Sequence, residues 1–399
     1  MARRLLPGPD AQQGLVALAL NSSTSLVAGA VLGSLTATFE RRPGLLVLVP
    51  AAIGLRGNVF GSLGNRVSTA LHAGDLQLRL RRSTVLGQNV LAAGALTLGM
   101  SLVLVGIAAL VSVGLGLGPT IGLADLAVLS VGGGALASLP VLAATLGLAA
   151  GAVRFGWDLD NVTAPLVSTL GDVLTLPALY LATGLLGLGL FTSGLGWVLA
   201  AGAIVAVIAG ARSSLPQVRR IVRSSIPVLM AAGLVSSLAG VALERRLDTF
   251  TALPALLILV PAHLSSAGAL GGILSGRLSS QLLLGLIPAT TVPSRGARLH
   301  LGFVAALSVP VFVVNGIGAH LVAGLLGQAS PGLGQLVAAS LLGGLVAMVA
   351  VLAIAYYGTI ATVRLGIDPD TYGIPMVSST VDLVGALTLI IAIGVSIPT

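Results

Sequence analysis

Residues 44–72 read GLLVLVPAAIGLRGNVFGSLGNRVSTALH, an apolar stretch interrupted by a proline and by several glycines. The stretch is long enough to cross a bilayer, which takes about 20 mostly apolar residues. Six of its positions recur 211 residues later, within residues 252–287: Val49, Pro50, Ala51, Gly57, Arg66 and Ser68 return as Val260, Pro261, Ala262, Gly268, Arg277 and Ser279. A spanning segment that occurs twice at a constant offset predicts an internally duplicated membrane protein.

The composition of the whole chain agrees with a membrane location. Of 399 residues, 56% are hydrophobic and only 8% are charged, whereas soluble domains carry about 25% charged residues. So few charges cannot cover the surface of a soluble globule of this size. Apolar runs of more than twenty residues also differ from the alternating strands of about ten residues in a β-barrel. We therefore predict an all-α polytopic membrane protein.

Residue counts exclude several kinds of site. The chain has no cysteine and four histidines, so disulfides, thiolate metal sites and cysteine nucleophiles are excluded, and a histidine-rich metal site is not expected. The net charge of +8 is interpreted as cytoplasmic arginine that orients a membrane protein, because basic loops mark the cytoplasmic side. The expected partners are membrane lipid and a small ion, with no nucleic acid.

Hydropathy places eleven spanning helices, at roughly 14–38, 44–72, 85–113, 122–152, 161–186, 189–210, 225–243, 252–287, 301–326, 334–362 and 373–397. With the N-terminus in the cytoplasm, thirteen arginines fall in cytoplasmic segments and four, Arg41, Arg42, Arg245 and Arg246, fall outside. This bias predicts a cytoplasmic N-terminus and an external C-terminus in the cell membrane. The second and eighth helices are expected to be broken at Pro50 and Pro261, as in the discontinuous helices of transporters.

A second duplicated block defines the repeat. Residues 158–172, DLDNVTAPLVSTLGD, return as residues 368–382, DPDTYGIPMVSSTVD, and Glu40–Arg41–Arg42 returns as Glu244–Arg245–Arg246. We predict a first five-helix repeat over 1–188, a linking helix over 189–215 and a second repeat over 216–399. Five helices per repeat plus one linking helix make the repeats parallel, related by a pseudo-twofold axis along the membrane normal. One chain would then imitate a homodimer, so we expect a monomer.

The repeated polar residues of the fifth helix are candidate ion ligands. Ser168 and Ser378 precede Asp172 and Asp382 by four residues, which places each pair on one helix face. Asp172 is about 18 Å from the cytoplasmic end of its helix at 1.5 Å per residue, and a charge at such depth costs about 2.5–3.5 kcal/mol or more. A divalent cation such as Mg²⁺, which takes oxygen ligands and keeps several waters, would offset this cost. The alternative is that the two aspartates are bonded to hydroxyl groups or arginine purely for packing.

Further polar positions have two interpretations each. Asp158, Asp160, Asp368 and Asp370 stand at helix starts, where they either cap the helix or form a vestibule that concentrates cations. Asn58 would supply an amide oxygen beside the pathway. Arg66 and Arg277 recur, and they either reach the membrane surface or pair with an acidic group. Arg56 corresponds to Ala267 in the second repeat, so the two halves are not equivalent. Asp125 is expected to cap a helix.

These motifs resemble those of a known family. Gly57–Asn58 followed by Arg66–Val67–Ser68–Thr69 is similar to the second-helix signature of MgtE-type Mg²⁺ transporters, and more similar to that of their duplicated solute-carrier branch. The Asp-Pro-Asp block at 368–382 resembles the fifth-helix signature of the same family. The resemblance implies two MgtE-like units with a cation pathway between them, and Asp172 and Asp382 as principal ligands. In the second repeat Gly268–Ala269 replaces Gly-Asn, which departs from the pattern.

The leading hypothesis is therefore transport of a largely hydrated divalent cation, with preference for Mg²⁺. A Na⁺- or H⁺-coupled Mg²⁺ exchanger is the alternative within transport. Two intramembrane aspartates could also form a protease dyad that shares one proton, although a Gly-x-Gly-Asp motif is absent. We expect no enzyme activity.

Overall fold

The computed structural model of the chain describes residues 9–42, 44–72, 74–114, 116, 121–155, 159–283, 285–366 and 373–397. Within these ranges the residues form helices and connecting loops, and none lies in a β-strand. The prediction of an all-α protein is thus confirmed.

The helices follow the apolar segments of the sequence closely. In chain order they are α1 (Pro9–Ser34), α2 (Thr36–Arg41), α3 (Leu45–His72), α4 (Val85–Gly114), α5 (Leu123–Ala127), the π-helical segment η2 (Val128–Gly133), α6 (Gly134–Phe155), α7 (Leu159–Thr183), α8 (Leu190–Ala211), α9 (Pro216–Glu244), α10 (Leu247–Ala252), α11 (Ala255–Leu283), α12 (Arg295–Leu325), α13 (Leu333–Leu365) and α14 (Ile374–Ser396). In the part of the chain described, nine helical segments are long and apolar enough to cross a membrane, and Leu18–Ser34 is a shorter apolar helix. The polytopic class is confirmed, while the number eleven stays a prediction.

The helix that is interrupted is not the one the sequence suggested. Pro50 and Pro261 lie inside the continuous helices α3 and α11, so the prediction that they break these helices is wrong. A proline in a spanning helix is tolerated where neighbouring groups satisfy the freed backbone. Near Pro261, Asn315 of α12 also donates a hydrogen bond of 3.1 Å to the carbonyl of Ala262, which joins α12 to α11. The π-helical segment η2 instead separates α5 from α6 within the fourth predicted span.

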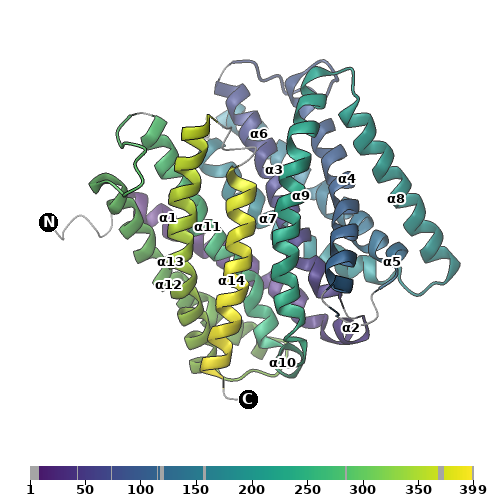
Figure 1. Ribbon diagram of the computed structural model, residues 1–399, viewed down its shortest axis with the longest axis vertical. Helices are drawn as coiled ribbons and strands as arrows, with labels where there is room; N and C mark the ends of the chain where they lie inside the picture. The colour runs from purple at the N-terminus through teal and green to yellow at the C-terminus, as the bar shows by residue number, and fades with distance from the viewer. Residues whose placement is uncertain are drawn as a thin grey trace. The chain divides into compact units, whose positions relative to one another are not determined.

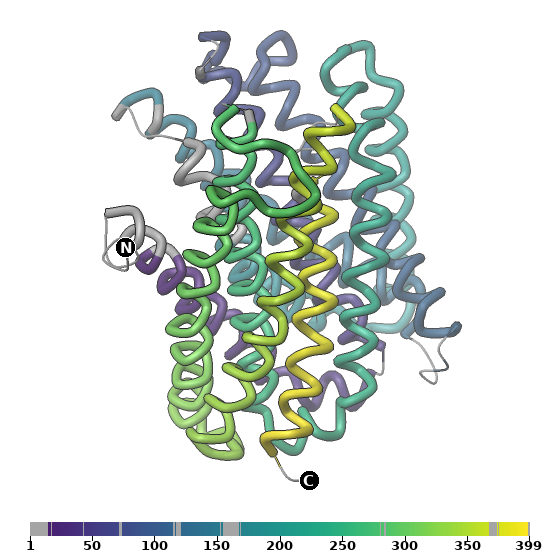
Figure 2. Tube along the Cα trace, turned by 60° about the vertical axis from the view of Figure 1, so that its left-hand side comes forward, coloured from purple at the N-terminus to yellow at the C-terminus, as the bar shows by residue number. Residues whose placement is uncertain are grey.

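The chain divides into two compact units that do not follow the order of the sequence. Unit 1 contains residues 1–37 and 246–399, and unit 2 contains residues 38–245. In unit 1, α1 packs against α11 and α12, and Figure 2 shows α12, α13 and α14 running side by side in green and yellow. In unit 2, α9 packs against α3 and α4, and α8 lies along α4 and α9 (Figure 1).

The first helix of each repeat is therefore exchanged. In unit 1, α1 approaches α11 so closely that a Cβ atom on Gly29 would overlap the backbone of Ile258. In unit 2, α9 meets α3 in the equivalent way, because a Cβ on Gly240 would lie 2.5 Å from the carbonyl oxygen of Val47. Gly240 and Ile258 each stand 211 residues after their counterparts, Gly29 and Val47. Each repeat thus supplies its first helix to the unit built from the other repeat, while the boundaries predicted for the repeats stay a prediction.

Candidate functional site

Asp172 lies on α7 at the level where α7 touches the middle of α3. Its side chain is 6% exposed. A Cβ on the preceding residue, Gly171, would lie 3.5 Å from Arg56 Cβ and 3.5 Å from the backbone nitrogen of Gly57. These are ordinary van der Waals distances, so Gly171 packs directly against Arg56 and Gly57, and Asp172 follows it on α7. The carboxyl group is therefore fixed inside unit 2, at mid-length of a helix with apolar flanks.

Asp382 occupies the equivalent place in unit 1. It lies on α14, where it is partly buried. The preceding residue, Val381, has its Cγ2 3.8 Å from where a Cβ on Gly271 of α11 would be, and a Cβ on Gly385 would lie 2.9 Å from Leu264 Cδ2. In both units the residue before the aspartate thus contacts the second helix of its repeat, although Val381 lies against Gly271 and not against Gly268, the counterpart of Gly57. The two aspartates are placed alike, one in each unit, and both form polar or electrostatic interactions within the chain.

The other predicted ligands are described in part. Asn58 is buried, with 5% of its surface exposed, and directly follows the glycine that meets α7. Ser378 is partly buried and lies one turn before Asp382 on α14. The side chains of Ser168 and Asp160 lie outside the described part of the structure, as do the residues Asp158, Asp368 and Asp370.

The repeated arginines bind residues of the third helix of each repeat. Arg66 donates a hydrogen bond of 2.7 Å from Nε to the side-chain oxygen of Asn89 on α4. In unit 1 the guanidinium carbon of Arg277 lies 4.3 Å from the ring centre of Phe303 on α12, a cation–π contact. Each arginine joins the second helix of its repeat to the third, so the recurrence has a structural function in both units.

The candidate ligands Asp172, Asp382, Ser168, Ser378 and Asn58 all carry side-chain oxygen atoms. Carboxylate, hydroxyl and amide oxygens suit hard cations such as Mg²⁺ and Ca²⁺. Within the described ranges, no group of three or more His, Asp or Glu side chains is close enough to hold a metal ion by itself. Among the described residues, neither aspartate therefore belongs to such a cluster.

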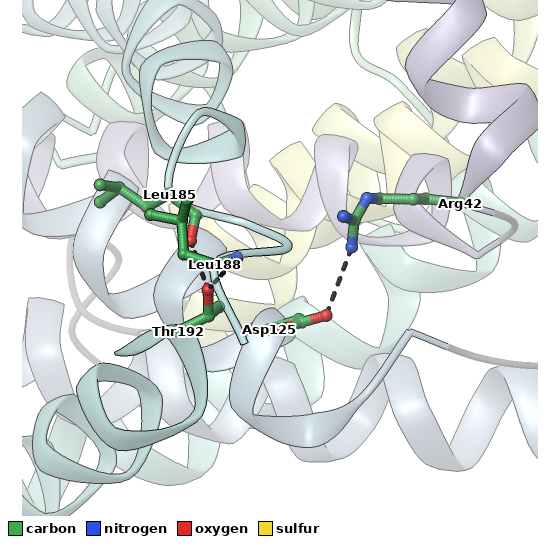
Figure 3. A network of polar contacts seen from close by, with 5 residues as sticks. All are labelled: Arg42, Asp125, Leu185, Leu188 and Thr192. Atoms are coloured by element: carbon green, nitrogen blue, oxygen red, sulfur yellow. Dashed lines mark hydrogen bonds and ion pairs between the residues drawn. The ribbon is translucent and has the colours of Figure 1, made fainter. Parts of the chain in front are cut away.

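A salt bridge in unit 2 was not expected from the sequence. Arg42, after α2, lies 3.3 Å from Asp125 on α5, and both side chains are 28% exposed (Figure 3). The N-cap of α5 is Gly122, so the prediction that Asp125 caps a helix is wrong. Nearby, Thr192 donates to the Leu185 carbonyl at 2.7 Å and accepts from the Leu188 amide at 3.0 Å, which fixes the turn before α8.

Sequence reasoning also missed the function of Glu244. This carboxylate ends α9, is 8% exposed, and accepts hydrogen bonds from the backbone amides of Gly44 (2.7 Å) and Leu46 (3.2 Å). It therefore caps the N-terminus of α3, where the free amides and the helix dipole favour a negative group. The recurrence of Glu40 as Glu244 was visible in the sequence, but a partner 200 residues away was not.

The chain matches the family model MgtE, described as "Divalent cation transporter", over residues 49–182 and 260–392. These two regions contain α3 to α7 and α11 to α14 respectively, so the family unit occurs twice. Both candidate aspartates lie inside the matched regions.

Individual relatives match both halves together. The chain is 28% identical over 383 residues to "Solute carrier family 41 member 2" of Xenopus laevis, an alignment that covers 89% of the chain and 66% of that relative. It is 25% identical to "Solute carrier family 41 member 3" of Mus musculus, covering 86% of the chain and 74% of that relative. The chain thus spans just under two thirds of the length of the first of these relatives. No solved structure matches the chain significantly.

The family match, which occurs twice, and the polytopic helical fold both support a transporter and not the protease of the alternative hypothesis. The chain belongs to the MgtE family of divalent cation transporters.

Proposed function

We propose that the protein transports divalent cations with preference for Mg²⁺, and that Asp172 and Asp382 bind the ion during its passage. One observation carries this proposal: the two aspartates occupy equivalent places in the two units of a duplicated divalent cation transporter. A carboxylate at this depth costs about 2.5–3.5 kcal/mol or more unless it is compensated. Its occurrence in both units favours a function that needs the charge.

The neighbouring oxygens complete a site for a hydrated ion. Ser168, Ser378 and Asn58 supply hydroxyl and amide groups near the aspartates, and Asp158, Asp160, Asp368 and Asp370 attract cations to the cytoplasmic end of the pathway. Mg²⁺ dehydrates reluctantly and is usually held by one or two carboxylates together with water. A site with one carboxylate per unit matches that preference better than it matches Ca²⁺, which takes six to eight oxygen ligands.

The orientation and assembly belong to the same proposal. The excess of arginine on one side supports a cytoplasmic N-terminus and an external C-terminus. Two family units in one chain support function as a monomer in the lipid bilayer, with the pathway between the repeats.

The proposal is tested by Mg²⁺ flux into liposomes that contain the purified protein. Replacing either aspartate, D172N or D382N, keeps the side-chain shape and removes the charge, so we expect flux to fall about tenfold or more, which corresponds to about 1.4 kcal/mol in binding of the transition state. D248N is the matched control because Asp248 lies on the short helix α10, away from both contacts. Wild-type flux in the D172N/D382N double variant would refute the binding role.

Coupled exchange is the second candidate, because oxygen-only sites of this kind serve channels and exchangers alike. Flux measured with an imposed Na⁺ or pH gradient at fixed membrane potential separates the two. A flux that follows the gradient identifies an exchanger, and a flux indifferent to both gradients identifies a channel.

A further inference from the structure

Arg56 is a charged residue in the interior of unit 2, next to the site of Asp172. Its side chain is 1% exposed and lies on α3, within a membrane-spanning helix. The guanidinium donates to the Ala52 carbonyl and lies 3.4 Å from both Ser101 Oγ and the Ser130 carbonyl oxygen, while Nε has no hydrogen-bond partner. No carboxylate among the described residues forms an ion pair with it. An uncompensated charge of this kind is expensive to bury.

Unit 1 contains the equivalent pocket with aromatic rings in place of the guanidinium. In unit 2, Ser130 donates a hydrogen bond of 2.7 Å to the Ser101 carbonyl; in unit 1, Ser340 donates one of 2.7 Å to the carbonyl of Phe312. A Cβ on Gly134 would overlap the Arg56 guanidinium, and a Cβ on the equivalent Gly344 would overlap the Phe312 ring. The phenyl ring thus takes the volume that the guanidinium takes in unit 2.

The residues around the two pockets differ in a compensating way. Ala52, Arg56 and Ser101 in unit 2 correspond, at an offset of 211, to His263, Ala267 and Phe312 in unit 1. His263 and Phe312 are both fully buried, with ring centres 4.9 Å apart. Unit 1 thus fills the equivalent volume with a phenyl ring and an imidazole, whose two nitrogens form no hydrogen bond with the described residues. The fold therefore does not require a guanidinium at this place. Packing does not explain why Arg56 is present.

The position of Arg56 relative to Asp172 gives it a function. A Cβ on Gly171 would lie 3.5 Å from Arg56 Cβ, and Asp172 is the next residue of α7, about 3.8 Å further along the chain from α-carbon to α-carbon. In a low-dielectric interior a fixed positive charge acts over many ångströms. It stabilises the empty carboxylate and weakens the binding of a cation there. Asp382 has Ala267 in place of this charge.

We propose that Arg56 is a positioning residue that lowers the cation affinity of Asp172 relative to Asp382, so that the two units bind the transported ion unequally and the ion is released from unit 2. This inference rests on the proposed function of the two aspartates. It assigns Asp382 as the tighter site and Asp172 as the weaker one. The aromatic filling of the unit 1 pocket, which has no arginine, maintains the difference.

The test compares neutral fillings of the unit 2 pocket. R56M removes the charge at similar volume, and A52H/R56A/S101F copies the filling of unit 1. Both variants are expected to lower the Mg²⁺ concentration for half-maximal flux by about tenfold and to reduce the maximal rate, because release becomes slower. S101A is the control, since it alters the same pocket and keeps the charge, and its half-saturation should match the wild type.

The outcomes separate this inference from the proposed function. If D172N leaves flux unchanged, the proposed function fails. If D172N lowers flux but neither neutral variant changes the half-saturation, or if S101A changes it equally, Arg56 has only a structural role and the inference is overturned. Tighter binding cannot result from damage to folding. In the D172N background, Mg²⁺-dependent thermal stabilisation should not respond to R56M, and a response there would also overturn the inference.

Discussion

At the scale of single residues, three buried charged side chains determine a helix cap and the surroundings of the candidate ion site. Glu244, Arg56 and Asp172 are all less than a tenth exposed, yet they differ in what compensates them. Glu244 accepts two backbone amides, whereas Arg56 bonds neutral oxygen groups and keeps one unbonded nitrogen. A charge whose bonds are satisfied contributes to structure, and one whose bonds are incomplete indicates function.

Glu244 provides a prediction about stability. E244A leaves two buried amides at the start of α3 without an acceptor, and each unsatisfied group costs about 1–3 kcal/mol. E244Q keeps one acceptor oxygen and should lose about half as much. We expect this order in thermal unfolding of the detergent-solubilised protein. E40A is the control, because Glu40 is an exposed glutamate on α2; an equal loss in E40A would contradict the capping role.

At the scale of helices, close contact between exchanged partners depends on glycine. Gly29 and Gly240 are the points where α1 meets α11 and α9 meets α3. A residue without a Cβ lets two helix backbones approach and pack, which is the main source of attraction between helices in lipid. The exchange of first helices is thus encoded at two positions that the duplication has kept in register.

Replacing these glycines should loosen the exchanged helices. G240A puts a Cβ 2.5 Å from the Val47 carbonyl oxygen, so the helices must separate, at a cost of about 1–3 kcal/mol. G106A is the control: Gly106 of α4 has nothing within 4 Å of its Cβ position, and alanine there should stabilise the helix by up to about 1 kcal/mol. Both are measured by thermal unfolding, and equal stability of the two variants would contradict the packing role of Gly240.

Helices were predictable from the sequence, but their partners were not. Apolar runs such as 85–113 and 334–362 correspond to α4 and α13, because lipid requires long helices whatever their neighbours. The recurrence of Asp172 as Asp382 also identified equivalent positions in the two units. The exchange of α1 and α9 and the cap by Glu244 depend on contacts across about 200 residues. The Arg56 pocket depends on contacts with Ser101 and Ser130, which are 45 and 74 residues away. Hydropathy carries no information on such contacts. The predicted break at Pro50 was wrong because a proline can be accommodated within a continuous spanning helix.

At the scale of the whole molecule, two units share one chain in an interleaved order. Residues 38–245 form unit 2 without interruption, while unit 1 joins the first 37 residues to those after 245. Ser22 of α1 and Ser266 of α11 meet with their hydroxyl oxygens 3.4 Å apart inside unit 1.

This arrangement can be tested by cross-linking, because the chain has no cysteine of its own. We expect S22C/S266C to form a disulfide under mild oxidation, because the two side-chain oxygens that the sulfur atoms would replace lie only 3.4 Å apart. After cleavage at a protease site introduced before α8, the two fragments should remain joined on a non-reducing gel. S23C/S266C should separate, because Ser23 is exposed on another face of α1. Separation in both variants would contradict the exchange.

The interleaved order has a consequence for synthesis in the cell. Unit 2 is complete once residue 245 has left the ribosome, but α1 has then waited for more than 200 residues without the helices it packs against. The entropic cost of closing a loop increases only slowly with its length, so the separation itself is a small penalty. An apolar helix without its native neighbours can, however, associate with other exposed apolar segments. The insertion machinery or the lipid itself must therefore shelter α1 until α11 and α12 arrive. Translation speed between these points becomes a determinant of how much active transporter the cell obtains.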